Sequence, residues 1–367
     1  MIFAMQLLCV AGVWPDFYKI VPLMMAFKEE PSIEAVFVHT GKYERLGQFF
    51  FDELHIPKPD IHLNVGAGSA TVQIASIMMR FEPIVLKFKP DYVLVVGDSD
   101  SAVACGLAAV NCRSKLIHVE AGLRCFDRTR HDENNRILVD SISDLLFASE
   151  PSGVGNLLRE GEYPSNIYFI GNAMVDTLLA CKEKIDRSDI LGRLRLEKRQ
   201  YAVLSLQQTT NIDNRETFRE ITEALEVIGK TLKIIFPFLP QIKKNSIGLK
   251  QYQSMSSIEN LSFVSHLGYP DYLCLIRNAR LSITDSDCVQ EETTILNVPC
   301  ITLSENTERQ ATITHGTNRL VHADAEAITM NYLDIILNWS ADMHTMPESW
   351  DGMAAKRIAL IVSGQWD

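Results

Sequence analysis

Between residues 97 and 136, charged side chains come just after runs of apolar residues. Asp98 follows one such run, and Glu120 follows the next. Apolar runs of this kind predict parallel strands, and ligands of open α/β sheets bind at the carboxyl ends of such strands. We therefore expect four carboxylates and two arginines to meet in one crevice: Asp98, Glu120, Asp132, Glu133, Arg124 and Arg136. This combination suits acid/base chemistry on an anionic substrate.

Apolar, β-branched runs recur along the chain at the spacing of strand–helix units, which predicts an α/β fold with parallel sheets covered by helices on both faces. In the first half, the predicted strands are Gln6–Ala11, Ala35–His39, Tyr92–Val96, Lys115–Val119, Asp144–Ala148 and Ile167–Ile170. In the second half, they are Ala202–Ser205, Leu232–Phe236, Leu261–Val264, Arg280–Thr284 and Pro299–Leu303. Helical periodicity between them is clearest at Asn214–Thr231 and Tyr269–Asn278.

The alternation of predicted strands and helices is interrupted at Gly171-Asn172 and again over the charged stretch Cys181–Gln200, which is predicted to be a helix. We place a domain boundary there. A second glycine-rich feature is the turn Gly66–Ser69, which is expected to open a helix near Ala70. Such turns can bind phosphate. Because no well-formed strand precedes this one, a flexible connector is the favoured interpretation.

The composition limits the function classes. The chain has 367 residues, 47% hydrophobic and 22% charged, with a net charge of −11, which argues against a nucleic-acid-binding face. No apolar run reaches the length of a membrane span and no signal-peptide pattern is present, so we expect a cytoplasmic protein. The eight cysteines form no Cys-x-x-Cys pair and the histidines show no metal-ligand spacing, which predicts reduced thiols and no metal site.

Longer motifs carry a resemblance to a known family. The sequence resembles the non-hydrolysing UDP-N-acetylglucosamine 2-epimerases nearly from end to end. In the first half, the matching stretches include Phe37–Gly41, Phe51–Leu54, Lys58–Asp60, Gly97-Asp98, His118–Arg124, Phe126–Arg128, Asn135-Arg136 and Ser143–Phe147. In the second half, they are Asn211–Asn214, Thr284–Ser286, Gln290–Glu292, Thr307–Arg309 and Gly316–Arg319.

The resemblance implies a GT-B architecture, in which two Rossmann-like, doubly wound domains face a central cleft. The implied domains are residues 1–172 with the carboxylate cluster, residues 173–350 for the nucleotide, and a C-terminal helix within 351–367 that crosses back to the first. The family's reaction eliminates UDP across C1–C2 of a UDP-sugar and adds it back with C2 inverted. The resemblance further implies a homodimer that needs no cofactor and no metal.

The resemblance also implies roles for single residues. Asp98, Glu120 and Asp132 occupy the carboxylate positions that move protons, and Arg136 faces substrate. In the second domain, Ser286 would bind the diphosphate, Glu292 the ribose hydroxyls and Tyr272 the uracil, with Arg309 near the cleft. Crowded carboxylates should raise one another's pKa, with Arg124 and Arg136 opposing that rise.

The sequence departs from the family where the family is basic or glycine-rich. Trp14, Gln207 and Gln208 stand where the family has arginine, histidine and arginine, and the segment Leu239–Gln241 has lost its His and Arg. Asp287-Cys288 replaces a Gly-Gly pair that lets backbone approach the diphosphate. Lys42 replaces a glutamine of the regulatory site of some bacterial members, so we expect no such site.

These losses predict weakened or altered activity. We consider three hypotheses for the function: a working 2-epimerase, a relative that acts on or hydrolyses another nucleotide sugar, and a non-catalytic binding or partner subunit on the same scaffold. Gln207 is still a candidate catalytic residue, although its amide cannot deliver a proton.

Overall fold

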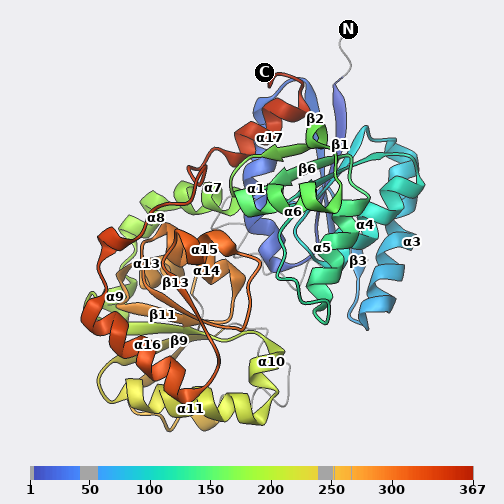
Figure 1. The fold of residues 1–367 in the computed structure, drawn as a ribbon. Coiled ribbons are helices and arrows are strands. Elements are labelled where there is room, and N and C mark those ends of the chain that lie inside the picture. Colours follow the sequence, from blue (N-terminus) through green and yellow to red (C-terminus); the bar gives the residue numbers. More distant parts are fainter. Residues whose placement is uncertain (1–3, 42–56, 239–250, 252, 266, 367) are drawn as a thin grey trace. The chain divides into compact units, whose positions relative to one another are not determined.

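A computed structural model describes residues 4–41, 57–238, 251, 253–265 and 267–366. These residues form two separate parallel sheets, one of seven strands and one of six, each with helices packed on it (Figure 1). The predictions for Lys42, for Phe51–Leu54 and for Leu239–Gln241 concern residues outside this description.

The first sheet has the strand order β3-β2-β1-β4-β5-β6-β7. Its strands are β1 (Met5–Ala11), β2 (Ile33–Gly41), β3 (Ile61–Val65), β4 (Tyr92–Val96), β5 (Lys115–Val119), β6 (Leu145–Ala148) and β7 (Ile167–Phe169). The chain reverses its direction of travel across the sheet between β1 and β4, which is the topological switch point of a doubly wound fold. The inner strands are buried because helices cover both faces.

The second sheet repeats the same plan, with the order β10-β9-β8-β11-β12-β13. Its strands are β8 (Tyr201–Ser205), β9 (Lys233–Phe238), β10 (Leu261–Ser265), β11 (Leu281–Thr284), β12 (Cys300–Leu303) and β13 (Asn318–Val321). Here the switch point lies between β8 and β11, which pair in parallel. The two sheets confirm the pair of Rossmann-like domains expected of a GT-B fold.

Helices connect the strands in both units. In the first unit they are α1 (Trp14–Glu29), α3 (Ala70–Phe88), α4 (Asp100–Asn111), α5 (His131–Ser141), α6 (Pro151–Glu160), η2 (Pro164–Asn166), α7 (Ala173–Ala180) and α17 (Ala354–Val362). In the second they are α8 (Lys182–Arg187), α9 (Ile190–Leu194), α10 (Thr209–Ile212), α11 (Arg215–Gly229), α13 (Tyr269–Asn278), α14 (Asp287–Ile295), α15 (Gln310–Thr314), α16 (Ala325–Asn338) and η4 (Ala341–Met343).

The first compact unit comprises residues 1–180 and 348–367, and the second comprises residues 181–347. The first unit thus extends past Asn172, because α7 packs on α1 and on α17. Asp176 of α7 accepts hydrogen bonds from the backbone N–H groups of Ala354 and Ala355 at 3.2 and 3.5 Å, which ties the start of α17 to the first unit.

The structure corrects the sequence prediction at several elements. The turn Gly66–Ser69 does follow a strand, β3, in which His62 and Asn64 interrupt the apolar pattern. Ser69 then caps α3, as its Oγ accepts from the Val72 N–H at 3.4 Å, so the helix begins at Ala70 as expected. Strand β13 was also missed. The charged stretch expected as one helix is instead α8 and α9, separated at Ser188-Asp189.

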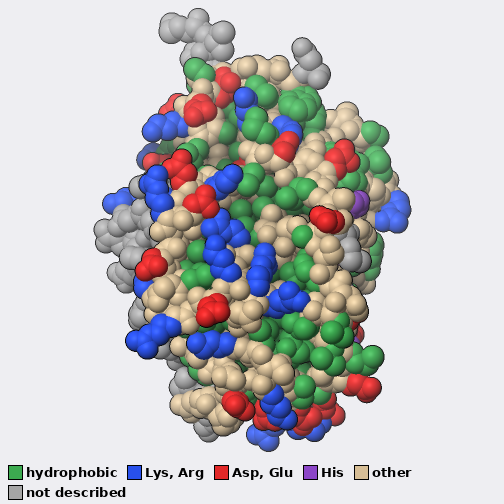
Figure 2. Space-filling model, turned by 90° about the vertical axis from the view of Figure 1, so that its left-hand side faces the viewer, with side chains coloured by type: hydrophobic (Ala, Val, Ile, Leu, Met, Phe, Trp, Pro, Cys, Tyr) green, Lys and Arg blue, Asp and Glu red, His purple; other side chains and the backbone are tan. Residues whose placement is uncertain are grey.

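The surface mixes side chains of all kinds. On the face shown in Figure 2, Lys and Arg side chains lie among acidic and apolar ones. Within the described ranges, no helix is both long enough and apolar enough to cross a membrane.

Candidate active site

The candidate site of the first unit lies at the carboxyl end of its sheet, at the switch point between β1 and β4. A cavity of about 290 Å³ opens there. Its lining comes from the segments that follow β1, β2, β3 and β4 and from the start of α5: Gly12, Val13, Thr40, Gly41, Val65, Gly66, Gln73, Ile77, Asp98, Ser99, Asp100, Ser101, His131 and Asn135. Asp98 is the predicted catalytic carboxylate among them.

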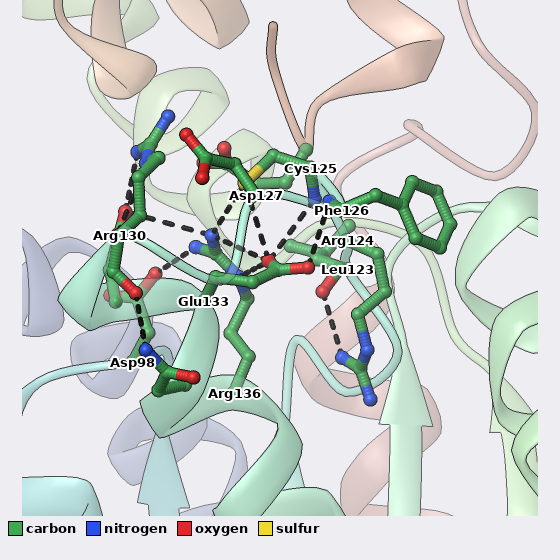
Figure 3. A network of polar contacts seen from close by, with 12 residues as sticks. Asp98, Leu123, Arg124, Cys125, Phe126, Asp127, Arg130, Glu133 and Arg136 are labelled. Carbon is green, nitrogen blue, oxygen red and sulfur yellow. Dashed lines mark hydrogen bonds and ion pairs between the residues drawn. The ribbon is translucent and has the colours of Figure 1, made fainter.

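Arg136 is the centre of the charged cluster beside this cavity. Its side chain is buried, and its Nη1 forms an ion pair with Asp98 while Nη2 lies 3.6 Å from an oxygen of Asp132. Its Nε donates to Glu133 at 3.0 Å. Glu133 in turn accepts from the backbone N–H groups of Cys125 and Phe126 at 3.1 and 2.9 Å (Figure 3). One buried guanidinium therefore holds two predicted catalytic carboxylates in place.

Asp98 and Asp132 keep part of their surface in contact with solvent, since about a third of each side chain is exposed, 36% and 31% respectively. Burial tends to raise the pKa of Asp132, but a hydrogen bond from Arg130 and the charge of Arg136 outweigh it, so this pKa lies below its usual value. The expectation of a pKa raised by crowding is wrong for Asp132. An ionised, partly exposed carboxylate is a competent proton acceptor.

Glu120 comes from the end of β5 and is fully buried in an ion pair with Lys19 of α1. It adopts a left-handed backbone conformation with φ of 72°. Lys19 was not recognised from the sequence. The signal was present, because Lys19 lies one helical turn after Asp16 on a helix face that is otherwise apolar.

Gly97 joins the Glu120 pair to Asp98. Its φ is 64°, and a Cβ placed on it would lie 3.3 Å from Lys19 Nζ and 3.5 Å from a Glu120 carboxylate oxygen. Glycine adopts this conformation without strain and leaves room for the ion pair. Hence the Lys19–Glu120 pair lies against the residue that precedes Asp98, and the three predicted carboxylates gather at one edge of the sheet.

Asp16 completes this edge. Its Oδ2 accepts from the backbone N–H groups of Gly12 and Val13 at 2.8 and 3.1 Å and from the Ser99 hydroxyl at 3.2 Å. Burial raises the pKa of Asp16 to about 6, against the charge of Lys19. Asp16 thereby links the turn after β1 to the start of α4.

Arg124 lies elsewhere, contrary to the prediction that it shares the crevice. It binds Asp140 at 2.7 Å and Glu160 at 2.6 Å. Asp140 also contacts His118 Nδ1 at 2.6 Å, and His118 Nε2 contacts the Gly97 carbonyl at 2.9 Å. Part of the motif 118–124 thus supports the loop that carries Asp98.

In the second unit, Asp285 organises the carboxyl ends of β8 and β11. Its carboxylate accepts from the backbone N–H groups of Gln207 and Gln208 at 2.7 and 3.1 Å and from Asn211 Nδ2 at 3.0 Å. Burial raises the pKa of Asp285 to about 6. Because Ser286 follows Asp285 directly and precedes α14, Gln207 and Ser286 lie at neighbouring strand ends.

Helix α14 begins with the residues that replace the family's glycines. Asp287 Oδ1 accepts from Gln290 Nε2 at 3.1 Å, so its carboxylate is held over the first turn. Cys288 beside it is half-buried. Trp14, the other conspicuous replacement, donates its indole N–H to the Tyr18 hydroxyl at 2.9 Å.

Glu292 of α14 is buried, and among the described residues no hydrogen-bond partner reaches its Oε2 oxygen. Burial raises the pKa of Glu292 to about 8, a hydrogen bond from Tyr269 opposes that rise, and the charge of Glu291 adds to it. Tyr272 is half-buried nearby. Burial and then the charge of Glu292 raise its pKa, against a hydrogen bond with Ser205. Tyr272 and Glu292 are therefore neighbours.

Arg309 is held by acidic partners. It lies 3.0 Å from Glu291 and 3.7 Å from Glu308, and it is buried. The neighbouring Gln290 accepts at Oε1 from the Thr307 hydroxyl at 3.0 Å, and its carbonyl accepts from Asn318 Nδ2 at 2.9 Å. The motifs at 290–292, 307–309 and 316–319 thus form one buried polar network. Across the described ranges, no cluster of His, Cys, Asp and Glu is arranged to hold a metal ion.

Comparisons with known proteins agree with this geometry. The family model described as UDP-N-acetylglucosamine 2-epimerase matches residues 25–363. The chain is 35% identical over 366 residues to the UDP-N-acetylglucosamine 2-epimerase of Methanococcus maripaludis, covering 97% of this chain and 98% of that one. It is 36% identical over 343 residues to the enzyme of that name from Methanocaldococcus jannaschii, covering 91% and 93%.

Solved structures show the same relationship. The crystal structure of Methanocaldococcus jannaschii UDP-GlcNAc 2-epimerase in complex with UDP-GlcNAc and UDP has a TM-score of 0.90 and 34% sequence identity to this chain, and the match covers 98% of this chain and all of the other. With a family match over most of its length and relatives above 30% identity, the chain belongs to the UDP-N-acetylglucosamine 2-epimerase family.

Proposed function

We propose that this protein is an isomerase that inverts C2 of a UDP-sugar, with UDP-N-acetylglucosamine as the first substrate to test. The observation that carries the proposal is the edge of the first sheet, where Arg136 holds Asp98 and Asp132 beside the cavity and Glu120 lies next to Gly97. The relative whose structure contains UDP-GlcNAc and UDP supports this choice of substrate.

The reaction explains why carboxylates are needed. The C2 proton of the sugar is weakly acidic, so a positioned base must remove it as the C1–O bond to UDP breaks. Asp132 can take this role because it is partly exposed beside the cavity and its lowered pKa keeps it ionised, although the lowered pKa also makes it a weaker base. We assign Asp98 and Glu120 to the same proton transfers, with Arg136 and Lys19 holding them in place.

We assign the nucleotide to the second unit. The Oε2 oxygen of Glu292, which has no hydrogen-bond partner among the described residues, can form a hydrogen bond with a ribose hydroxyl. Because the pKa of Glu292 is raised to about 8, the carboxyl group is largely protonated near neutral pH and can donate as well as accept. The neighbouring Tyr272 has the ring to stack on uracil. Ser286, before α14, would offer its hydroxyl and the helix N-terminus to the diphosphate. Arg309, which forms an ion pair with Glu291, would contribute positive charge at the edge of this site.

The same unit gives a reason to expect slow turnover. Gln207 can donate a hydrogen bond to a leaving phosphate, but it brings neither a proton nor a positive charge. The carboxylate of Asp287 adds negative charge where the diphosphate would lie. These two residues support the second candidate function, a relative that hydrolyses or binds a different nucleotide sugar.

Two further assignments follow the family resemblance. We assign the protein to the cytoplasm and to a homodimer, and we expect it to work with no cofactor. Size-exclusion chromatography with light scattering tests the dimer directly, because a monomer mass at micromolar concentration would contradict it.

The function itself is tested with purified protein and UDP-GlcNAc, followed by ¹H and ³¹P NMR. We expect slow appearance of the C2-inverted sugar nucleotide without net release of UDP. Accumulation of free UDP and free sugar would favour the hydrolytic candidate. An unchanged substrate would contradict both, and binding of UDP alone would then favour a non-catalytic subunit.

A further inference from the structure

A reaction that inverts C2 exchanges the protonation states of the two groups that transfer the proton. The C2–H electron pair forms the C1=C2 bond as the C1–O pair leaves with UDP, and one carboxylate keeps the proton. On return, UDP oxygen attacks C1 and the C1=C2 pair takes a proton at the opposite face from a second carboxylic acid. After each turnover one group is left protonated and the other ionised, so both must be reset.

We propose that His131, held by Asp100, carries protons between solvent and the carboxylates Asp98 and Asp132 in this reset. The proposal rests on the proposed function. His131 begins α5, and its Nε2 lies 2.6 Å from Asp100 Oδ1. A carboxylate partner of this kind orients the imidazole.

The location of His131 suits such a role. Its side chain is 60% exposed, so one end of the dyad reaches solvent. His131, Asp100 and Asp98 all line the same cavity. Asn135 connects them further, because its Nδ2 donates to the Asp98 carbonyl at 2.9 Å and to Asp100 Oδ1 at 3.2 Å.

Several charged groups surround His131. Asp98 lines the cavity from the loop after β4 and Asp100 from the first residue of α4, and Arg130 and Asp132 flank His131 in sequence. Arg130 and Arg136 both bind Asp132. The lining from the segments after β2 and β3 and from α3 is uncharged. A second imidazole, His39 of β2, lies 3.3 Å from a Cβ placed on the lining residue Gly41, but it is buried, whereas His131 reaches solvent.

The test is the steady-state rate of epimerisation of UDP-GlcNAc by wild type and His131→Gln, first at a low buffer concentration and then with added imidazole at the same pH. Because the reset occurs in the free enzyme after product has left, a slower reset lowers kcat and leaves kcat/KM almost unchanged. We expect the substitution to lower kcat by about 10-fold, which is less than the roughly 10²–10⁴-fold that a group acting in the chemical step contributes. Added imidazole should restore the lost rate, and Asp100→Asn should give a smaller loss.

The matched control is His322→Gln. His322 also pairs with a carboxylate, Glu305 at 3.3 Å, but both side chains are exposed on the second unit. We expect its kcat and buffer dependence to equal those of wild type. If wild type epimerises and His131→Gln keeps the same kcat without imidazole, the relay is wrong while the proposed function stands. A wild-type protein without epimerase activity would instead overturn the proposed function and the relay with it.

Discussion

Glu133 and Arg136 are joined one helical turn apart on α5, with the Arg136 Nε donating to the Glu133 carboxylate at 3.0 Å. Glu133 is also bonded to the backbone of Cys125 and Phe126, so it anchors the segment after β5 to the helix. These contacts restrict the rotation of the Arg136 guanidinium. Its remaining nitrogens reach Asp98 and Asp132, which is how two distant carboxylates come to share one cation.

The first prediction concerns Asp132. Asp132→Asn removes a carboxylate whose pKa is lowered and which we expect to act as a base. The substitution should reduce kcat by about 10²–10⁴-fold and change KM little. Asp334→Asn is the matched control, because Asp334 also pairs with an arginine, Arg319 at 2.5 Å, but lies on α16. Equal losses in the two variants would contradict a catalytic role for Asp132.

The second prediction concerns the buried pair of Lys19 and Glu120. Lys19→Met leaves a buried carboxylate without its cation, which should cost about 3–5 kcal/mol in the free energy of unfolding. The double variant with Glu120→Gln should recover part of that loss. Urea unfolding measures both. Arg187→Met, which breaks the exposed pair with Glu183 at 3.2 Å, should change stability by less than about 1 kcal/mol. A small effect of Lys19→Met would show that the pair does not hold this edge.

The sequence predicts most of the fold because the strand signal was strong where strands are buried on both faces. The runs 92–96 and 115–119 match β4 and β5 to the residue. Strand β3 was missed because the prediction relied on continuous apolar runs, and β3 alternates apolar residues with His62 and Asn64. Strand β13 was missed because Asn318 and Arg319 make half of its four residues polar.

The site was predictable to the extent that strand ends can be located. Asp98 and Glu120 were found because each follows a strand. Arg124 was misplaced because its partners, Asp140 and Glu160, come from α5 and α6, and helix packing of this kind leaves no mark in the local pattern. Lys19 was missed although a charged residue on the otherwise apolar face of α1 was a local signal, because its partner Glu120 lies about a hundred residues away.

The third prediction concerns pH and the C-terminal helix. Burial raises the pKa of Asp176 to about 7, against hydrogen bonds from Ala355 and Ala354. The folded protein therefore keeps this proton at pH values where the unfolded chain has released it, so this group's contribution to stability is lost as pH rises from about 4 through 7. Asp176→Asn should reduce the loss of stability between about pH 5 and pH 8, measured by urea unfolding. An identical pH dependence in both proteins would contradict the raised pKa.

The fourth prediction concerns the residues that replace the family's basic and glycine positions. Gln207→His combined with Asp287→Gly and Cys288→Gly restores an imidazole and removes a negative charge beside the expected diphosphate. UDP should then bind more tightly by calorimetry, and turnover should rise toward the roughly 10²–10⁴-fold that a general acid contributes. Gln208→His is the control, because it adds an imidazole at the adjacent position. No gain from the triple variant would mean that the second unit is adapted to another ligand.

The most direct measurement of the central claim is deuterium incorporation at C2 during incubation of the protein with UDP-GlcNAc in D₂O. If the carboxylates beside Arg136 remove and return the C2 proton, ¹H NMR should show loss of the C2 signal in the inverted product, and Asp132→Asn should abolish that exchange. Inverted product that retains its original C2 hydrogen, or equal exchange in wild type and Asp132→Asn, would contradict the account.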